Sequence, residues 1–115
     1  MQYLLLIYNN EKAFQNVRQE EGEKIMTDYM NFTQSIVKSG HFKGGDGLQP
    51  TATATTVRAS GTTDGPFAET KEQLGGYYLI DAQNLDDAIS IAKRIPVIKH
   101  GGCVEVRPVM DTPKP

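Results

Sequence analysis

The most informative stretch of the chain is Asp64-Gly65-Pro66-Phe67-Ala68-Glu69-Thr70-Lys71-Glu72-Gln73-Leu74-Gly75-Gly76-Tyr77-Tyr78-Leu79-Ile80-Asp81. It opens with a turn, because Gly65 tolerates a positive φ and Pro66 keeps the residue before it out of the helical region. A charged segment follows, and after Gly75-Gly76 the chain becomes apolar and aromatic, which predicts a strand over residues 74–81. Buried strands seldom follow such a charged segment, so we expect a functional site beside this turn.

Strands and helices alternate on both sides of this stretch. The sequence predicts a first strand over residues 2–8, a helix over 23–39, a hairpin at a sheet edge over 51–59 and 62–64, a second helix from the N-cap Asn84 to Pro96, and a last strand over 103–107. Spacings of three and four predict a buried stripe on the first helix of Met26, Tyr29, Met30, Thr33, Ile36 and Val37. The same spacings predict a buried face on the second helix of Leu85, Ala88, Ile89, Ala92 and Ile95.

This order of elements is that of the ferredoxin-like split β-α-β fold, an α+β class in which two helices cover one face of an antiparallel sheet. The first and central strands carry large apolar side chains on both faces. Monomers rarely leave so large an apolar patch exposed, and each fully buried Leu or Ile contributes about 1.5–3 kcal/mol. We therefore predict a symmetric homodimer whose sheets pack face to face as a dimeric α+β barrel.

Composition limits the classes of protein and site. The 115 residues predict one domain over 1–110, followed by a disordered tail over 111–115. A net charge of −2 argues against nucleic-acid binding, and no apolar run is long enough to cross a bilayer. The single cysteine, Cys103, fits a cytoplasmic protein and is expected to be an inert thiol in the core. No residue spacing resembles a metal site, and we expect no cofactor.

Asp64 and Tyr29 are the candidate catalytic residues. Asp64 can act as a general base near the end of the sheet, or it can shape the Asp-Gly-Pro turn by accepting backbone hydrogen bonds. Tyr29 can supply a hydroxyl donor to a pocket, or it can belong to an aromatic core.

The candidate ligand-binding residues are Arg58, Glu69, Lys71, Glu72 and Arg107. The two glutamates, if held close, would raise one pKa and make a proton carrier. They can equally take part in solvated or dimer-bridging ion pairs, which stabilise little. Each arginine can hold a carboxylate ligand in a bidentate grip, and Arg107 can instead pair with a nearby glutamate such as Glu105.

The thirteen residues 64–76 resemble the signature of the DGPF branch of the YCII-related proteins, and the similarity extends to residues 1–8, 45–50, 54–58 and 104–108. The resemblance implies a ferredoxin-like dimeric α+β barrel. It implies little about activity, since most members have no assigned reaction. Wider relatives of the barrel include lactone isomerases and dehalogenases, and many DGPF proteins accompany alternative sigma factors. Simpler YCII-type proteins carry a His-Asp pair with the His on the first helix, where this chain has Tyr29 and Asn31 but no His.

Three functions stay open at this point. The protein can bind a small organic ligand in a cavity at the dimer sheet interface. It can be a small lyase-type or isomerase-type enzyme acting on a lactone or organic acid, with Asp64 as base, Tyr29 as donor and Arg58 or Arg107 as anchor. It can also be a regulatory partner of an alternative sigma factor, as the resemblance suggests. An enclosed cavity with convergent polar groups and a perturbed pKa favours the enzyme.

Overall fold

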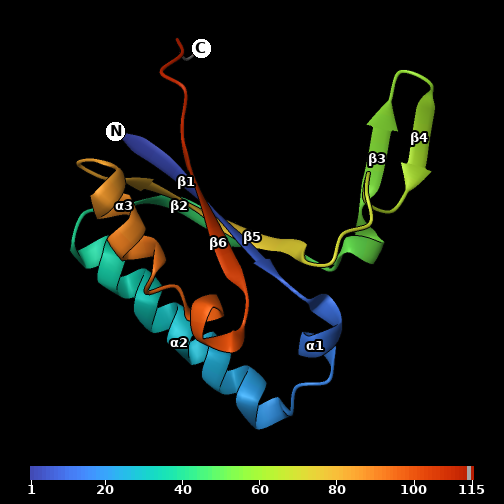
Figure 1. Ribbon diagram of the computed structural model, residues 1–115, viewed down its shortest axis with the longest axis horizontal. Coiled ribbons are helices and arrows are strands. Elements are labelled where there is room, and N and C mark those ends of the chain that lie inside the picture. Colours follow the sequence, from blue (N-terminus) through green and yellow to red (C-terminus); the bar gives the residue numbers. More distant parts are fainter. Residues whose placement is uncertain (114) are drawn as a thin grey trace.

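A four-stranded antiparallel sheet in the order β2-β5-β1-β6 organises the computed structural model, which describes residues 1–113 and 115 (Figure 1). Its strands are β1 (Gln2–Asn9), β2 (Phe42–Gly47), β5 (Gln73–Asp81) and β6 (Cys103–Pro108). The helices are α1 (Glu11–Gln15), α2 (Gln19–Lys38) and α3 (Leu85–Ala92), with 3-10 turns η1 (Thr51–Thr53) and η2 (Pro96–His100). This order and topology confirm the predicted ferredoxin-like α+β fold.

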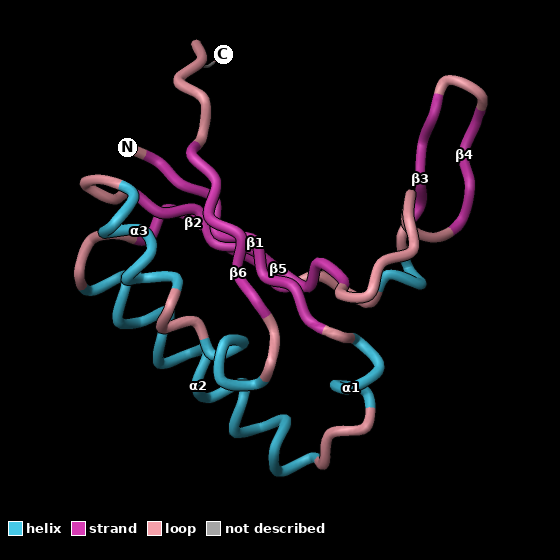
Figure 2. The backbone as a smooth tube through the Cα atoms, viewed as in Figure 1, coloured by secondary structure: helices cyan, strands magenta, loops and turns pink. Residues whose placement is uncertain are grey.

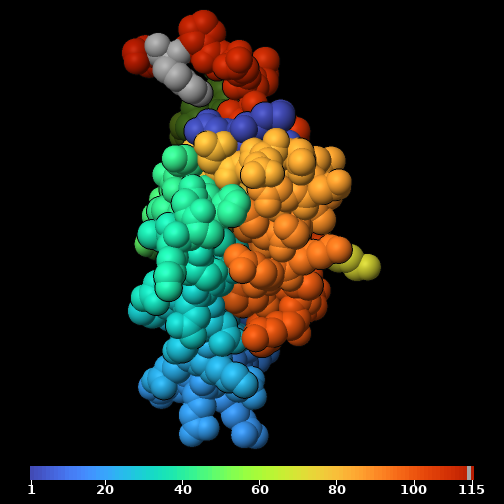
Figure 3. Space-filling model, turned by 90° about the vertical axis from the view of Figure 1, so that its left-hand side faces the viewer, coloured from blue at the N-terminus to red at the C-terminus, as the bar shows by residue number. Residues whose placement is uncertain are grey.

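The core lies between the sheet and the two long helices, which cover the same side of the sheet (Figure 2). Alternate residues of the central strands point toward the helices and are buried: Tyr3, Leu5, Ile7, Tyr78 and Ile80. Their neighbours on the other face are half-buried: Leu4, Leu6, Tyr8, Tyr77 and Leu79. We call this second surface the open face, because no helix of the described residues covers it. In Figure 3, α2 and α3 lie side by side over the sheet.

The predicted buried stripe of α2 is wrong in part. Met26, Met30 and Val37 are more than half exposed, whereas Phe32 and Ile36 are buried. The helix is turned toward Phe32 because that ring packs edge-to-face on Tyr78, with ring centroids 5.2 Å apart. The helix also begins at Gln19, four residues before the predicted start.

The second helix is closer to its prediction. Asn84 is the N-cap, since its side chain accepts a hydrogen bond from the Asp87 amide at 2.9 Å. Ala88, Ala92 and Ile95 are buried as expected, but Leu85 is 48% exposed and Ile91 takes a buried position instead. Leu85 is the first residue of the helix.

The predicted hairpin forms, but not at the edge of the main sheet. Strands β3 (Thr55–Arg58) and β4 (Gly61–Asp64) pair only with each other and make a separate two-stranded sheet. The turn at Ser60-Gly61 has Gly61 at φ +135°, and the following Gly65 has φ +94°, as the glycines predicted. The edge of the main sheet beside β5 is occupied by β2.

Two other expectations concern the end of the chain. Cys103 is exposed, not in the core, because its position on β6 places it on the open face opposite Tyr8. Residues 111–113 and 115 have no helix or strand; Lys114, part of the predicted disordered tail, lies outside the described residues. Among the residues that the structure describes, no helix combines the length and the apolar character needed to span a bilayer.

Candidate functional site

A cavity of about 470 Å³ lies between the N-terminal half of α2, helix α1 and the helix-facing side of the sheet where β2 meets β5. We call it the α2 pocket. Its apolar walls come from Ile7, Phe14, Ile25, Tyr29 and Phe42. Its size and aromatic lining are those of a site for a small organic molecule. A second hollow between α2 and residues 93–99 is more open to solvent, and the exposed side chains of Lys93, Arg94 and Lys99 lie along it, so it is the weaker candidate.

Glycines shape the sheet side of the α2 pocket. A Cβ at Gly45 would lie 2.8 Å from the Tyr77 carbonyl oxygen and 2.8 Å from Cδ1 of Tyr78. Only glycine therefore lets the Tyr78 ring lie against β2. That ring also packs edge-to-face on Phe32 and Phe42, which fixes its orientation as a wall of the cavity.

Uncharged polar side chains line the pocket: the amide of Asn9 and the hydroxyls of Tyr29, Thr33 and Tyr78. The hydroxyls of Thr33 and Tyr78 are hydrogen-bonded at 2.7 Å. Burial, reinforced by the neighbouring Tyr78, raises the pKa of Tyr29 to about 12, although a hydrogen bond with the Val97 backbone opposes the shift. Burial also raises the pKa of Tyr78, opposed by its hydrogen bond with Thr33. Both tyrosines therefore stay protonated near neutral pH and can donate hydrogen bonds.

The one carboxylate among the lining residues belongs to Asp46. It is exposed, and its Oδ2 accepts a hydrogen bond from the Tyr77 hydroxyl at 3.1 Å. Because Asp46 pairs with Tyr77 across the strands, both side chains are on the opposite face from Tyr78. The interior of the pocket consequently holds apolar groups and uncharged donors.

The structure separates the residues that the sequence singled out. Tyr29 lines the α2 pocket. The other six lie elsewhere and are exposed: Arg58, Asp64, Glu69, Lys71, Glu72 and Arg107. Arg58 and Asp64 belong to the β3–β4 hairpin, whereas Arg107 is on β6 and donates to Glu105 at 2.8 Å, which is the alternative considered for it. Glu72 Oε2 is 4.0 Å from the Cys103 sulfur. The charged segment therefore does not converge on one cavity.

Glu11 is a functional candidate that the sequence did not reveal. Its two carboxylate oxygens accept hydrogen bonds from the backbone N–H and the hydroxyl of Thr51, each at 2.8 Å. Its own N–H donates to Gln73 Oε1 at 3.0 Å. These bonds tie α1, a wall of the α2 pocket, to the base of the hairpin and to the start of β5. The N-cap Asn10 signals the helix, but nothing local signals a partner forty residues away.

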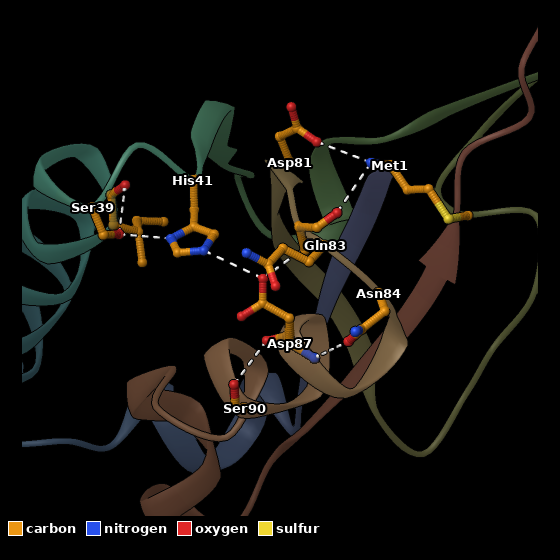
Figure 4. A network of polar contacts seen from close by, with 10 residues as sticks. Met1, Ser39, His41, Asp81, Gln83, Asn84, Asp87 and Ser90 are labelled. Atoms are coloured by element: carbon orange, nitrogen blue, oxygen red, sulfur yellow. Dashed lines mark hydrogen bonds and ion pairs between the residues drawn. The ribbon is translucent and has the colours of Figure 1, made fainter.

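A row of hydroxyl, imidazole and carboxylate joins the end of α2 to the start of α3 (Figure 4). Ser39 Oγ lies 2.7 Å from His41 Nδ1, and His41 Nε2 lies 3.4 Å from Asp87 Oδ2. Ser39 Oγ also lies 3.2 Å from the Ile36 carbonyl oxygen, and none of the three side chains lines the α2 pocket. The row is therefore a structural link between two helix ends. The described residues contain no group of three potential metal ligands.

Comparison with known proteins identifies the family. The YCII-related domain matches residues 1–113. The chain belongs to the YCII-related family. Within it, an uncharacterized protein of Rhizobium meliloti (strain 1021) is 41% identical over 114 residues, which cover 95% of this chain and 92% of the relative. The family membership agrees with the resemblance found in the sequence and leaves the activity open.

Proposed function

We propose that this YCII-related protein binds a small, uncharged and largely apolar molecule in the α2 pocket. The observation that carries the proposal is the lining: aromatic walls, with the amide of Asn9 and the hydroxyls of Tyr29, Thr33 and Tyr78 as uncharged polar groups. Apolar cavities with a few placed donors are the usual form of small-molecule sites. A carbonyl or lactone oxygen is the acceptor that such donors suit.

The charge of the lining favours a neutral ligand over the organic acid that the enzyme hypothesis allowed as a substrate. Among the described residues that line the pocket, none is cationic. A carboxylate ligand would lose its hydration there without gaining an ion pair, which is costly. Arg58 and Arg107, the anchors considered for an acid, do not line the pocket.

The same lining favours binding over proton-transfer catalysis. Asp64, the candidate base, is exposed on β4 and does not line the pocket. Tyr29 holds its proton more firmly than a free tyrosine, so it suits the role of donor. Asp46, the carboxylate of the described lining, is on the opposite face from Tyr78, so it does not face a molecule bound inside the pocket as a general base would.

We further propose that the protein is a cytoplasmic homodimer of the DGPF branch. The half-buried apolar side chains of the open face support dimerisation, since Leu4, Leu6 and Leu79 would gain burial against a second copy. The exposed free thiol of Cys103 suits a reducing compartment. The resemblance of residues 64–76 to the DGPF signature supports membership of that branch.

Ligand-observed NMR with matched pairs of fragments tests the binding proposal. Neutral aromatic ketones, amides and lactones are expected to bind, while the corresponding carboxylates bind at least ~10-fold more weakly, a difference of about 1.4 kcal/mol. An Ile25→Trp variant should fill the pocket and abolish binding. Met30→Trp is the matched control, because Met30 is on the same helix, 57% exposed and not part of the lining. Preference for the carboxylates, or equal loss in both variants, would refute the proposal.

A further inference from the structure

The β3–β4 hairpin, residues 55–64, stands apart from the rest of the chain; we call it the arm. Its strands hydrogen-bond only with each other, and every residue of β4 is exposed. Val57 is 75% exposed although it is a branched apolar residue on a strand. An isolated two-stranded hairpin is marginally stable in water, so the arm lacks within one chain the contacts that such an element normally needs.

The arm extends to the side of the sheet away from α2 and α3 (Figure 1). The radius of gyration is 15.6 Å, against about 13 Å for a compact chain of this length. The arm therefore projects on the side toward which the open face is directed.

The area of the open face can be compared with the area that a stable dimer interface buries. Four strands of six to nine residues, about 4.8 Å apart and at roughly 3.3 Å per residue, outline a face of roughly 450 Å². A standard stable interface buries roughly 800 Å² on each partner. The outline of the open face is smaller than this, and the arm is exposed surface on the same side that a second copy can also cover.

We propose that the arm of each copy packs on the second copy of this chain, so that the two arms are exchanged across the dimer. This inference rests on the homodimer proposed above and adds to it a second contact, separate from the face-to-face packing of the sheets. Exchange of an identical element is a common way to enlarge a symmetric interface. Exchange would give the arm the packing contacts that it does not make within its own chain.

The two faces of the arm differ, which makes the proposal specific. Val57 is opposite Thr62, and this face carries the exposed apolar side chain of the arm. On the other face Thr56 is opposite Thr63, and the Thr56 hydroxyl donates to the Gly65 carbonyl at 2.8 Å within the same chain. We therefore assign the Val57 face to the contact with the second copy.

Sedimentation of the full chain and two point variants tests the arm. The full chain should sediment as a dimer of twice 12.7 kDa. Val57→Glu should raise the dimer dissociation constant by at least ~10-fold, because it places a charge in the contact. Thr63→Glu, on the opposite face of the same hairpin, should change it less than about 3-fold. Equal effects of the two variants, or no effect of either on a persistent dimer, would overturn the assignment.

Photo-crosslinking separates failure of the arm from failure of the dimer. A benzoylphenylalanine at position 57 should capture a second copy, identified by mixing isotope-labelled and unlabelled chains. A dimer that crosslinks only within one chain would refute the exchanged arm and leave the homodimer standing. A full chain that stays monomeric at ~100 μM would refute both, and crosslinking to some other protein in a lysate without self-capture would also overturn the proposal.

Discussion

At the scale of single residues, the fold alters the chemistry of Tyr29 strongly, since burial raises its pKa to about 12. A tyrosine with a raised folded-state pKa holds its proton longer when folded, so its contribution to stability is complete below about pH 10. That contribution is lost as the pH rises toward 12. We expect the free energy of unfolding, measured with urea, to fall between pH 10 and 12. Tyr29→Phe should make this fall shallower, with the remaining slope due to Tyr78 and other groups; an unchanged slope would contradict the assignment.

Adjacent glycines on β2 give a second prediction at this scale. A Cβ at Gly45 would collide with the Tyr77 carbonyl and the Tyr78 ring, whereas a Cβ at Gly44 meets nothing within 4 Å. Gly45→Ala should therefore cost about 1–3 kcal/mol of stability and weaken ligand binding in the α2 pocket. Gly44→Ala should stay within about 1 kcal/mol of the wild type. Chemical denaturation of both variants measures these changes. Similar losses in the free energy of unfolding would show that the position of the Tyr78 ring does not depend on glycine at position 45.

At the scale of elements, Glu11 links α1 to the base of the arm through Thr51. Removing its carboxylate leaves the Thr51 N–H without its partner, which should cost about 1–2 kcal/mol. We expect Glu11→Ala to lower the free energy of unfolding and to speed hydrogen exchange at the Thr51 amide. Glu20→Ala is the control, because Glu20 is an exposed acidic residue in the first turn of α2. Unchanged exchange at Thr51 in Glu11→Ala would show that the contact does not hold the arm base.

The elements also show which parts of the fold a sequence can predict. Strands β1 and β5 and the cap at Asn84 follow local rules of alternation and capping, and each forms as expected. The stripe of α2 was misassigned because Met26 and Met30 satisfy the helical period as well as Phe32 does, and only packing on Tyr78 decides between them. The separation of the arm from the sheet depends on long-range geometry that no local pattern carries.

At the scale of the whole molecule, the candidate site could be predicted only in part. Tyr29 was found because an aromatic residue at a helical position suggests a pocket. Phe14, Phe42 and Gly45 were not, because the cavity arises where α1, α2, β2 and β5 converge. The charged residues Glu69, Lys71 and Glu72 near Asp64 were singled out for their density in the sequence, yet all of them are exposed. A functional site beside the Asp64-Gly65-Pro66 turn remains a prediction. Asp64 is the last residue of the arm, so such a site would lie at the end of the arm.

Cys103 offers a test of the complete assembly, because its exposed thiol lies on the open face that a second copy would cover. Burial, together with the carboxylates of Glu72 and Glu105, raises the pKa of this thiol, so alkylation should be slow at pH 7 and faster as the pH rises. At pH 9, iodoacetamide should modify the thiol at least ~10-fold more slowly in concentrated protein than in protein diluted below the dimer dissociation constant, since only thiols of the free monomer react. Leu6→Glu, at the centre of the open face, should keep the chain monomeric and make the rate independent of concentration. If the wild-type rate is equally independent of concentration, the sheets do not pack face to face over Cys103, and the chain is either monomeric or pairs through another surface.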